Sequence, residues 1–204
     1  TVAVSASAAA DAITAAVPEM LPFAVPLAIV VVILLTGMNL RGLRESANFL
    51  MFPVYFFVAV IALMILWGLF QAVTGQLPYQ AASRVGTSFS GLSFVLFMRA
   101  FSSGSSSLTG VEAISNAVPN FKVPKERHAA ATLTTMAVIL ATFFGGITFL
   151  SYWYGIRPDA HSTVLSQIAA TTFGGHGVGF YVVQLATAMI LAVAANTGFS
   201  AFPM

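Results

Sequence analysis

Charge is scarce in this sequence and cysteine is absent. Only 7% of the 204 residues are Asp, Glu, Lys or Arg, whereas a soluble domain typically has about 25% charged residues. The lack of cysteine excludes a disulfide framework, a thiolate nucleophile and a thiolate-bound metal. A net charge of only +2 gives no basic surface for nucleic acid, which we do not expect as a partner. With 58% hydrophobic residues, the composition predicts a protein of the lipid bilayer.

Long charge-free runs divide the chain into membrane spans. A bilayer core about 30 Å thick needs roughly 20 mostly apolar residues in a helix. The intervals between charges therefore predict an all-α, polytopic membrane protein with a single transmembrane domain. Because apolar segments reach both ends, we expect a fragment cut inside membrane segments. The predicted spans are 1–17 (partial), 20–40, 47–70, 87–118, 129–155 and 178–204, with a surface helix over 162–173 capped by Ser162 or Thr163.

Basic residues are unequally distributed between the predicted loops. Loops 41–46 and 119–128, with the residues next to them, hold five Lys or Arg residues, whereas the opposite loops hold two, Arg84 and Arg157. Short cytoplasmic loops carry the excess of basic residues in membrane proteins. We therefore expect 41–46 and 119–128 to be cytoplasmic in a multi-pass protein of the plasma membrane.

The span over 87–118 contains an unusual polar cluster, SSGSSSLTG, from Ser102 to Gly110. Irregular backbone at membrane depth is tolerated only where protein or water surrounds it. We expect the helix to break near 102–110, with Gly104 and Gly110 as hinges, because glycine best accepts an unwound backbone. Two half-helices would then expose carbonyls and amides near the midplane, where a small ion can bind. The alternative is close helix packing through small residues.

Glu112 follows this cluster directly. An ionised carboxylate at that depth is costly unless it is paired or solvated, so such residues are functional candidates. Burial disfavours the charged carboxylate and a nearby cation favours it. Cation binding and proton release would therefore be linked at Glu112, which favours proton-coupled cation transport. The alternative is a protonated, hydrogen-bonded strut inside the helix bundle.

Other polar residues give weaker signals. Thr1 and Ser5 are four residues apart and share a helix face, so their hydroxyls could line a cavity, although spacing alone favours packing. The histidines at 128, 161 and 176 are scattered and indicate no metal site. GGHGVG matches neither a phosphate loop nor a dinucleotide fingerprint. We expect no cofactor, no metal beyond a transported ion and no enzyme activity.

Several segments carry a family resemblance. LTGVEAISNAVPNFKVPKERHAA resembles the sixth helix and following basic loop of the amino acid-polyamine-organocation superfamily. More narrowly, the chain resembles the KimA-type potassium importers within that superfamily. That resemblance is carried by four segments in order: TVAVSASAAADAIT, NLRGLRES, AFSSGSSSLTGVEAISNAVPNFK and AANTGFSAFP.

The resemblance implies a five-plus-five inverted-repeat, LeuT-like fold with a discontinuous sixth helix, of which this chain holds the end of helix 3 through helix 8. It implies uptake of potassium coupled to protons by alternating access, and a homodimer of the complete protein. The potassium-lining hydroxyls of helix 3 match Thr1 and Ser5. The potassium-binding pair of helix 6 matches Thr109 and Glu112, with Glu112 as the proton-coupling group.

Two other functions stay open at this stage. An amino acid or polyamine permease of the same fold could use the same broken helix for a carboxylate or an amine. A non-transporting membrane scaffold would use the serine cluster for packing alone.

Overall fold

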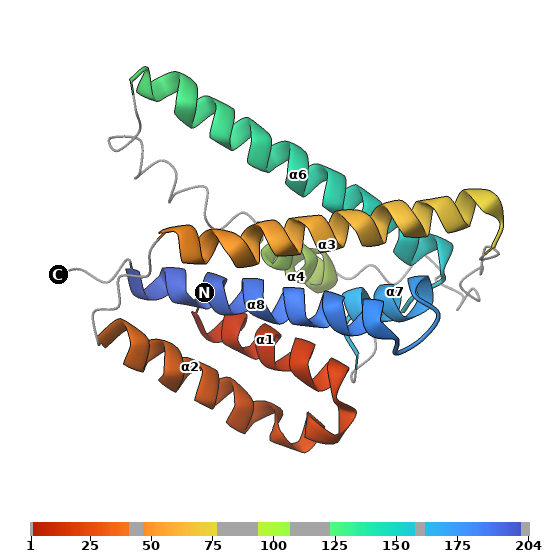
Figure 1. Ribbon diagram of the computed structural model, residues 1–204, viewed down its shortest axis with the longest axis horizontal. Coiled ribbons are helices and arrows are strands. Elements are labelled where there is room, and N and C mark those ends of the chain that lie inside the picture. The colour runs from red at the N-terminus through yellow and green to blue at the C-terminus, as the bar shows by residue number, and fades with distance from the viewer. Residues whose placement is uncertain (1, 41–46, 77–93, 107–122, 158–161, 201–204) are drawn as a thin grey trace. The chain divides into compact units, whose positions relative to one another are not determined.

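The computed structural model describes residues 2–40, 47–76, 94–106, 123–157 and 162–200 (Figure 1). These residues form helices joined by turns, without a strand among them, which confirms the predicted all-α class. They belong to two compact units, one of residues 1–82 and 146–204 and the other of 83–145. In chain order the elements are α1 (Val2–Ala16), the 3-10 helix η1 (Pro18–Phe23), α2 (Ala24–Leu40), α3 (Ala47–Thr74), α4 (Phe94–Ser106), α6 (Lys125–Trp153), α7 (Val164–Thr172) and α8 (Val178–Ser200).

In the part of the chain that the structure describes, three helices are long and apolar enough to cross a membrane, namely Met51–Thr74, Lys125–Trp153 and Val178–Asn196. Val2–Ala16 and Pro18–Leu34 are shorter apolar segments. At 1.5 Å per residue, a helix needs about 20 residues to cross the bilayer core. Large apolar side chains on the outside of these helices suit a lipid environment, since a soluble protein would bury them.

The helices differ from the predicted spans at their ends. Residues 20–40 form η1 followed by α2, because Pro18 and Pro22 restrict the backbone and lack the amide that an α-helix needs. α4 covers Phe94–Ser106, and residues 87–93 of the predicted span lie outside the described residues. α6 begins at Lys125, four residues before the expected start of its span, so its first turn carries charged residues.

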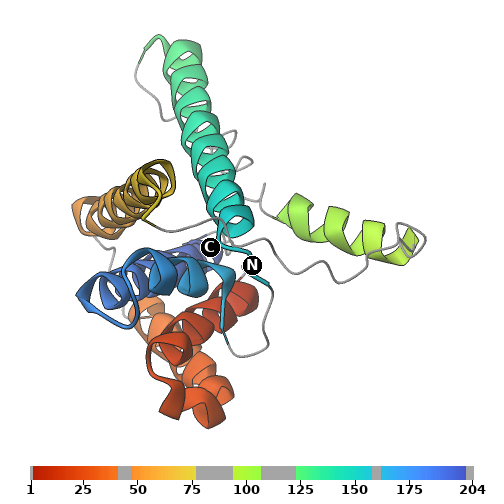
Figure 2. The same ribbon diagram turned by 90° about the vertical axis from the view of Figure 1, so that its right-hand side faces the viewer.

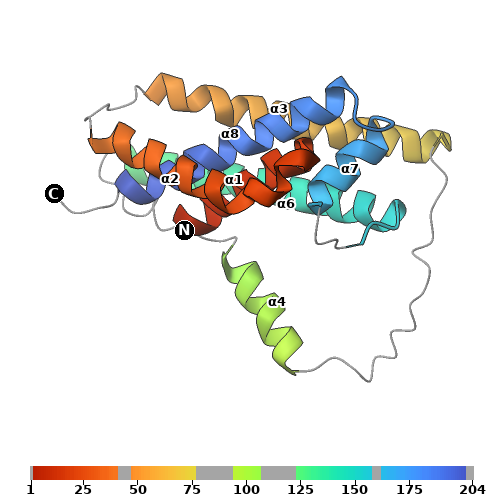
Figure 3. The ribbon, with the colours of Figure 1, turned by 90° about the horizontal axis from the view of Figure 1, so that it is seen from below.

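In the first unit, α8 packs against both α1 and α3. α2 lies beside α1 and also contacts α8, and α7 packs on α8 and α3 (Figures 1 and 3). Figure 2 views the unit from the end where η1 joins α1 to α2 and where α7 precedes α8. Small side chains on α1 are almost completely buried, which lets its backbone approach its neighbours closely. These are Ala6, Ala9, Ala10 and Ala12.

Two glycines bring α3 and the C-terminal part of α6 into close contact. A Cβ atom added to Gly146 would lie 2.6 Å from Cγ2 of Ile65, and one added to Gly68 would lie 2.8 Å from Cδ1 of Leu150. Ile65 and Leu150 are themselves buried. Each glycine therefore provides the space that a branched side chain of the other helix occupies.

The short helix α7 is held by local and tertiary contacts. Thr163 caps its N-terminus by accepting a hydrogen bond from the Ser166 amide at 3.1 Å, which confirms one of the two predicted caps. Thr172, near its end, lies 3.4 Å from the Tyr154 hydroxyl, to which it donates. Gly174 and Gly175 follow with φ of 73° and 120°, conformations that favour glycine after a helix.

The second unit contains α4 and the part of α6 up to Gly145. Threonine side chains in this part of α6 are hydrogen-bonded within the helix itself. Four threonine hydroxyls donate to the carbonyl four residues earlier, at 2.8–2.9 Å. They belong to Thr132, Thr134, Thr135 and Thr142. Because these hydroxyls are satisfied locally, the helix can be surrounded by apolar groups.

The substitution Gly146→Ala should destabilise the protein by about 1–2 kcal/mol. Overlap with Ile65 costs about 1–3 kcal/mol, and the better helix propensity of alanine offsets less than about 1 kcal/mol of that. The neighbouring Gly145→Ala is a matched control, because a Cβ there meets nothing within 4 Å. Thermal unfolding of the detergent-solubilised protein measures both, and equal melting temperatures for the two variants would contradict this packing.

Removing the cap with Thr163→Ala should destabilise α7 by about 0.5–2 kcal/mol, because the Ser166 amide loses its acceptor. Hydrogen exchange of the Val164–Thr172 amides should quicken while exchange in α3 stays the same. Thr163→Ser retains the hydroxyl and should retain the protection. Unchanged exchange in the alanine variant would show that the cap does not stabilise α7.

Candidate functional site

Only part of the predicted site lies within the described residues. Ser5 belongs to α1 and Gly104 to α4. Thr1, Thr109, Gly110 and Glu112 lie outside the described residues. The predicted grouping of these residues around one cation therefore stays a prediction.

Ser5 is half-buried near the beginning of α1. A helix turns by about 100° per residue, so Ala9 and Ala12 share the face of Ser5, whereas Ser7 lies on a different side. Ala9 and Ala12 are each only 2% exposed. The Ser5 hydroxyl thus lies at the edge of the packed side of α1, on the face where Thr1 was predicted.

The helix α4 is continuous through Ser102 and Gly104 to Ser106. Gly104 is exposed, and a Cβ there would meet nothing within 4 Å. Serine and glycine lower helix propensity by only about 0.5–1 kcal/mol each relative to alanine, which leaves the helix intact here. Residues 107–110, with Gly110, lie outside the described residues, so the break predicted near 102–110 and its hinges at Gly104 and Gly110 stay predictions.

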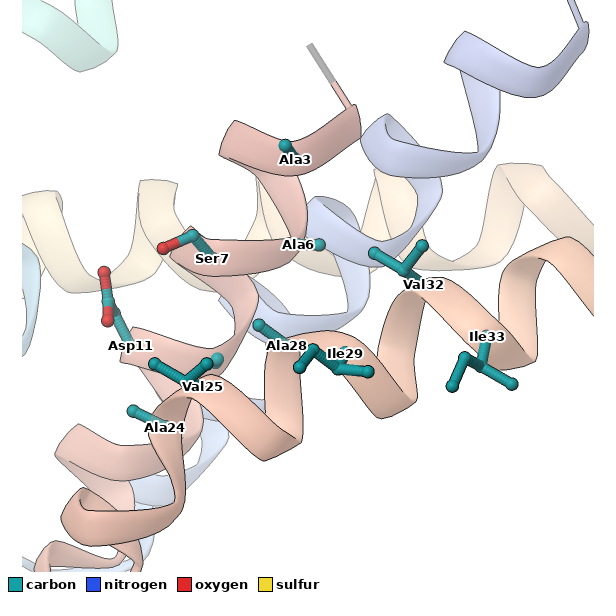
Figure 4. A pocket seen from close by; sticks show the side chains of 11 residues that line it. Ala3, Ala6, Ser7, Asp11, Ala24, Val25, Ala28, Ile29, Val32 and Ile33 are labelled. Carbon is teal, nitrogen blue, oxygen red and sulfur yellow. The ribbon is translucent and has the colours of Figure 1, made fainter.

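A groove of about 470 Å³ lies between α1 and α2 (Figure 4). Its polar side chains are Ser7 and Asp11, one turn apart on α1, while α2 contributes apolar side chains such as Ile29 and Val32. Sequence analysis did not identify this groove, although the spacing of Ser7 and Asp11 places them on one face. The missing information was the partner helix, because nothing in the α2 sequence indicates which of its apolar faces meets α1.

A second cavity, of about 550 Å³, lies at the end of the first unit where α1, η1, α7 and α8 meet. Gln167 lines it, and its Nε2 donates to the Arg157 carbonyl at 3.0 Å. The Phe180 ring also lines it and lies edge-on to His176, with ring centroids 4.5 Å apart. The other polar lining residues are Thr14, Ser162 and Ser166. This cavity combines apolar walls with a few hydrogen-bonding groups, as binding pockets do.

Within the described ranges, no cluster of three or more His, Asp or Glu residues could hold a metal ion. The chemistry that these helices offer is that of hydroxyls, amides and one carboxylate, Asp11, beside apolar walls. Together with the His176 imidazole at the cavity, such groups can bind water, a bare cation or a polar solute.

Comparison with known proteins agrees with the membrane architecture. The family model described as amino acid permease matches residues 1–204. The chain is 52% identical over all 204 residues to the potassium transporter KimA of Bacillus subtilis (strain 168), of which it spans 33%. The resemblance to amino acid-polyamine-organocation transporters is thereby confirmed, and the family is one of permeases and not of enzymes. With a match over its whole length, the chain belongs to the amino acid permease family of membrane proteins.

Proposed function

We propose that this chain is part of a secondary transporter that takes up potassium together with protons by alternating access. The observation that carries the proposal is the 52% identity, over the whole chain, to a protein described as a potassium transporter. The match covers all 204 residues and therefore includes Ser5, Thr109 and Glu112. The low charge and the long apolar helices support a role within the bilayer.

The proposed cation site consists of oxygen atoms. Thr1, Ser5 and Thr109 would supply hydroxyl oxygens, and Glu112 a carboxylate, in place of the water molecules around potassium. Ser5 supports this role by its position at the edge of the packed face of α1. Glu112 would release its proton when the cation binds and recover it when the cation leaves. The unwound segment near Gly110 would add backbone carbonyls at the midplane.

Alternating access requires one part of the transporter to stay rigid while another moves. α1, α2 and α8 contact one another pairwise, and the buried alanines of α1 keep them close. We propose that these three helices, which correspond to helices 3, 4 and 8 of the LeuT-like fold, form the rigid part. The broken sixth helix, beginning with α4, would belong to the moving part.

The proposed topology follows the distribution of basic residues. Loops 41–46 and 119–128 would face the cytoplasm of a cell whose plasma membrane holds the protein. η1, α7 and the cavity between them would then face outward. The complete protein would form a homodimer, with potassium and protons as the transported species and lipid as its surroundings.

An amino acid or polyamine permease is the second candidate, and the family description, amino acid permease, favours it. Such a solute needs a roomy, partly apolar pocket, whereas potassium needs closely spaced oxygens. Uptake of labelled potassium, amino acids and polyamines by the full-length protein in liposomes distinguishes the two. Uptake of none of these solutes would favour a non-transporting scaffold.

In the full-length protein, Glu112→Gln should reduce potassium uptake to about a tenth or less, which corresponds to at least about 1.4 kcal/mol of lost interaction. Any remaining uptake should lose its dependence on the proton gradient, because the amide cannot carry the proton. Glu126→Gln is the matched control, since Glu126 is exposed in the first turn of α6. Wild-type uptake in the Glu112 variant would overturn its assignment.

Ser5→Ala should raise the KM for potassium about five- to tenfold, the equivalent of about one neutral hydrogen bond or ligand. Ser7→Ala removes a hydroxyl from the groove between α1 and α2, about 160° around α1 from Ser5, and should leave KM unchanged. Initial rates of rubidium or potassium uptake over a concentration series measure both variants. If the two variants have the same KM, Ser5 is not a ligand.

A further inference from the structure

Gln184 of α8 is a buried amide without a partner. Its side chain is 2% exposed, and neither Nε2 nor Oε1 makes a hydrogen bond with any described residue. Buried polar groups in native proteins are nearly always paired, with protein or with ordered water. An unpaired one costs its full desolvation free energy, and in a membrane protein the surrounding lipid cannot compensate. A hydrogen-bonding partner for this amide is therefore to be sought outside the described residues.

The position of Gln184 relates it to the cavity at the η1 and α7 end. Phe180 lines that cavity and is itself fully buried. It lies four residues before Gln184 along α8. Residues four apart lie on one face of a helix, about one turn from each other. Gln184 is thus one turn deeper in the first unit than the aromatic ring that borders the cavity.

The hydrogen-bonding atoms of the Gln184 amide indicate which kind of molecule binds to it. Oε1 accepts hydrogen bonds and Nε2 donates them, so a cation would match the first atom and be repelled by the second. Water both donates and accepts and satisfies the two atoms together. The neighbouring cavity of about 550 Å³ has room for several water molecules, and its polar lining residues are the kind that hold them.

We propose that Gln184 binds water inside the first unit, and that this water extends the hydrated cavity past Phe180 into the membrane part of the protein. The proposal rests on the proposed function in one respect, that a proton-coupled transporter needs a hydrated route for protons. Phe180 then acts as the barrier between the cavity and the inner water, and Gln184 as the group that keeps that water in place.

X-ray radiolytic labelling of the full-length protein tests the water site without any transport assay. X-rays convert bound water into hydroxyl radicals, and these oxidise the side chains beside it. Val183 adjoins Gln184, is 0% exposed and is not among the residues that line the cavity, yet it should be labelled in the wild type. In Gln184→Leu its labelling should fall about tenfold, since loss of one good hydrogen bond corresponds to about that factor in occupancy. Gln71→Leu is the matched control, because it removes an amide from α3 of which only Oε1 is buried and unpartnered, and it should leave Val183 labelled.

Thermal unfolding and proton influx distinguish the remaining outcomes. Gln184→Leu should melt at the wild-type temperature or higher, because it removes an unpaired amide, and should reduce potassium-driven proton influx about tenfold. A lower melting temperature would mean that a protein side chain pairs with Gln184, which overturns the water site. An unlabelled Val183 in the wild type also overturns it. Labelling with unchanged influx in the variant would overturn the role in proton supply, whereas a wild type that takes up no potassium would refute the proposed function and leave the water site standing.

Discussion

The interior of a bilayer contains almost no water, and this constraint governs every polar group in the described helices. Most threonine hydroxyls are satisfied by their own helix. Thr36 in α2 and Thr187 in α8 each donate to the carbonyl four residues earlier, at 2.7 Å and 2.8 Å, as the threonines of α6 do. Since these bonds need no second helix, they allow the helix surfaces to be apolar and free to pack or to meet lipid.

The same constraint draws attention to the polar groups that are not hydrogen-bonded within their own helix. Asp11 lies in the groove between α1 and α2, where the walls are mostly apolar. Gln184 is buried among helices with both amide atoms unpartnered within the described part of the chain. A transporter must bring water or ions into its interior, and side chains of this kind are the ones that can receive them. Packing and transport therefore make opposite demands on the same helices.

Close packing through small residues meets the requirement that the helices associate tightly. The alanines of α1 let α8 and α2 approach it, and Gly68 and Gly146 let α3 and α6 exchange branched side chains. Lipid offers no hydrophobic driving force between helices, so tight contact supplies much of their association. Under the proposed alternating-access mechanism, a rigid group of helices formed in this way would be the surface against which the moving part shifts.

Sequence alone determined that this chain is an all-α membrane protein, where most of its helices lie, that Thr163 or its neighbour caps α7, and which family it resembles. These features depend on composition, on the length of apolar runs and on residues close together in the chain. Tertiary structure decided which faces pack, because α3 and α8 are apolar all round and their patterns single out no face. In the structure α4 is continuous up to Ser106, Gly146 lies against Ile65, and Gln184 is buried. These outcomes depend on contacts between distant segments or on small differences in free energy, and no local sequence pattern contains that information.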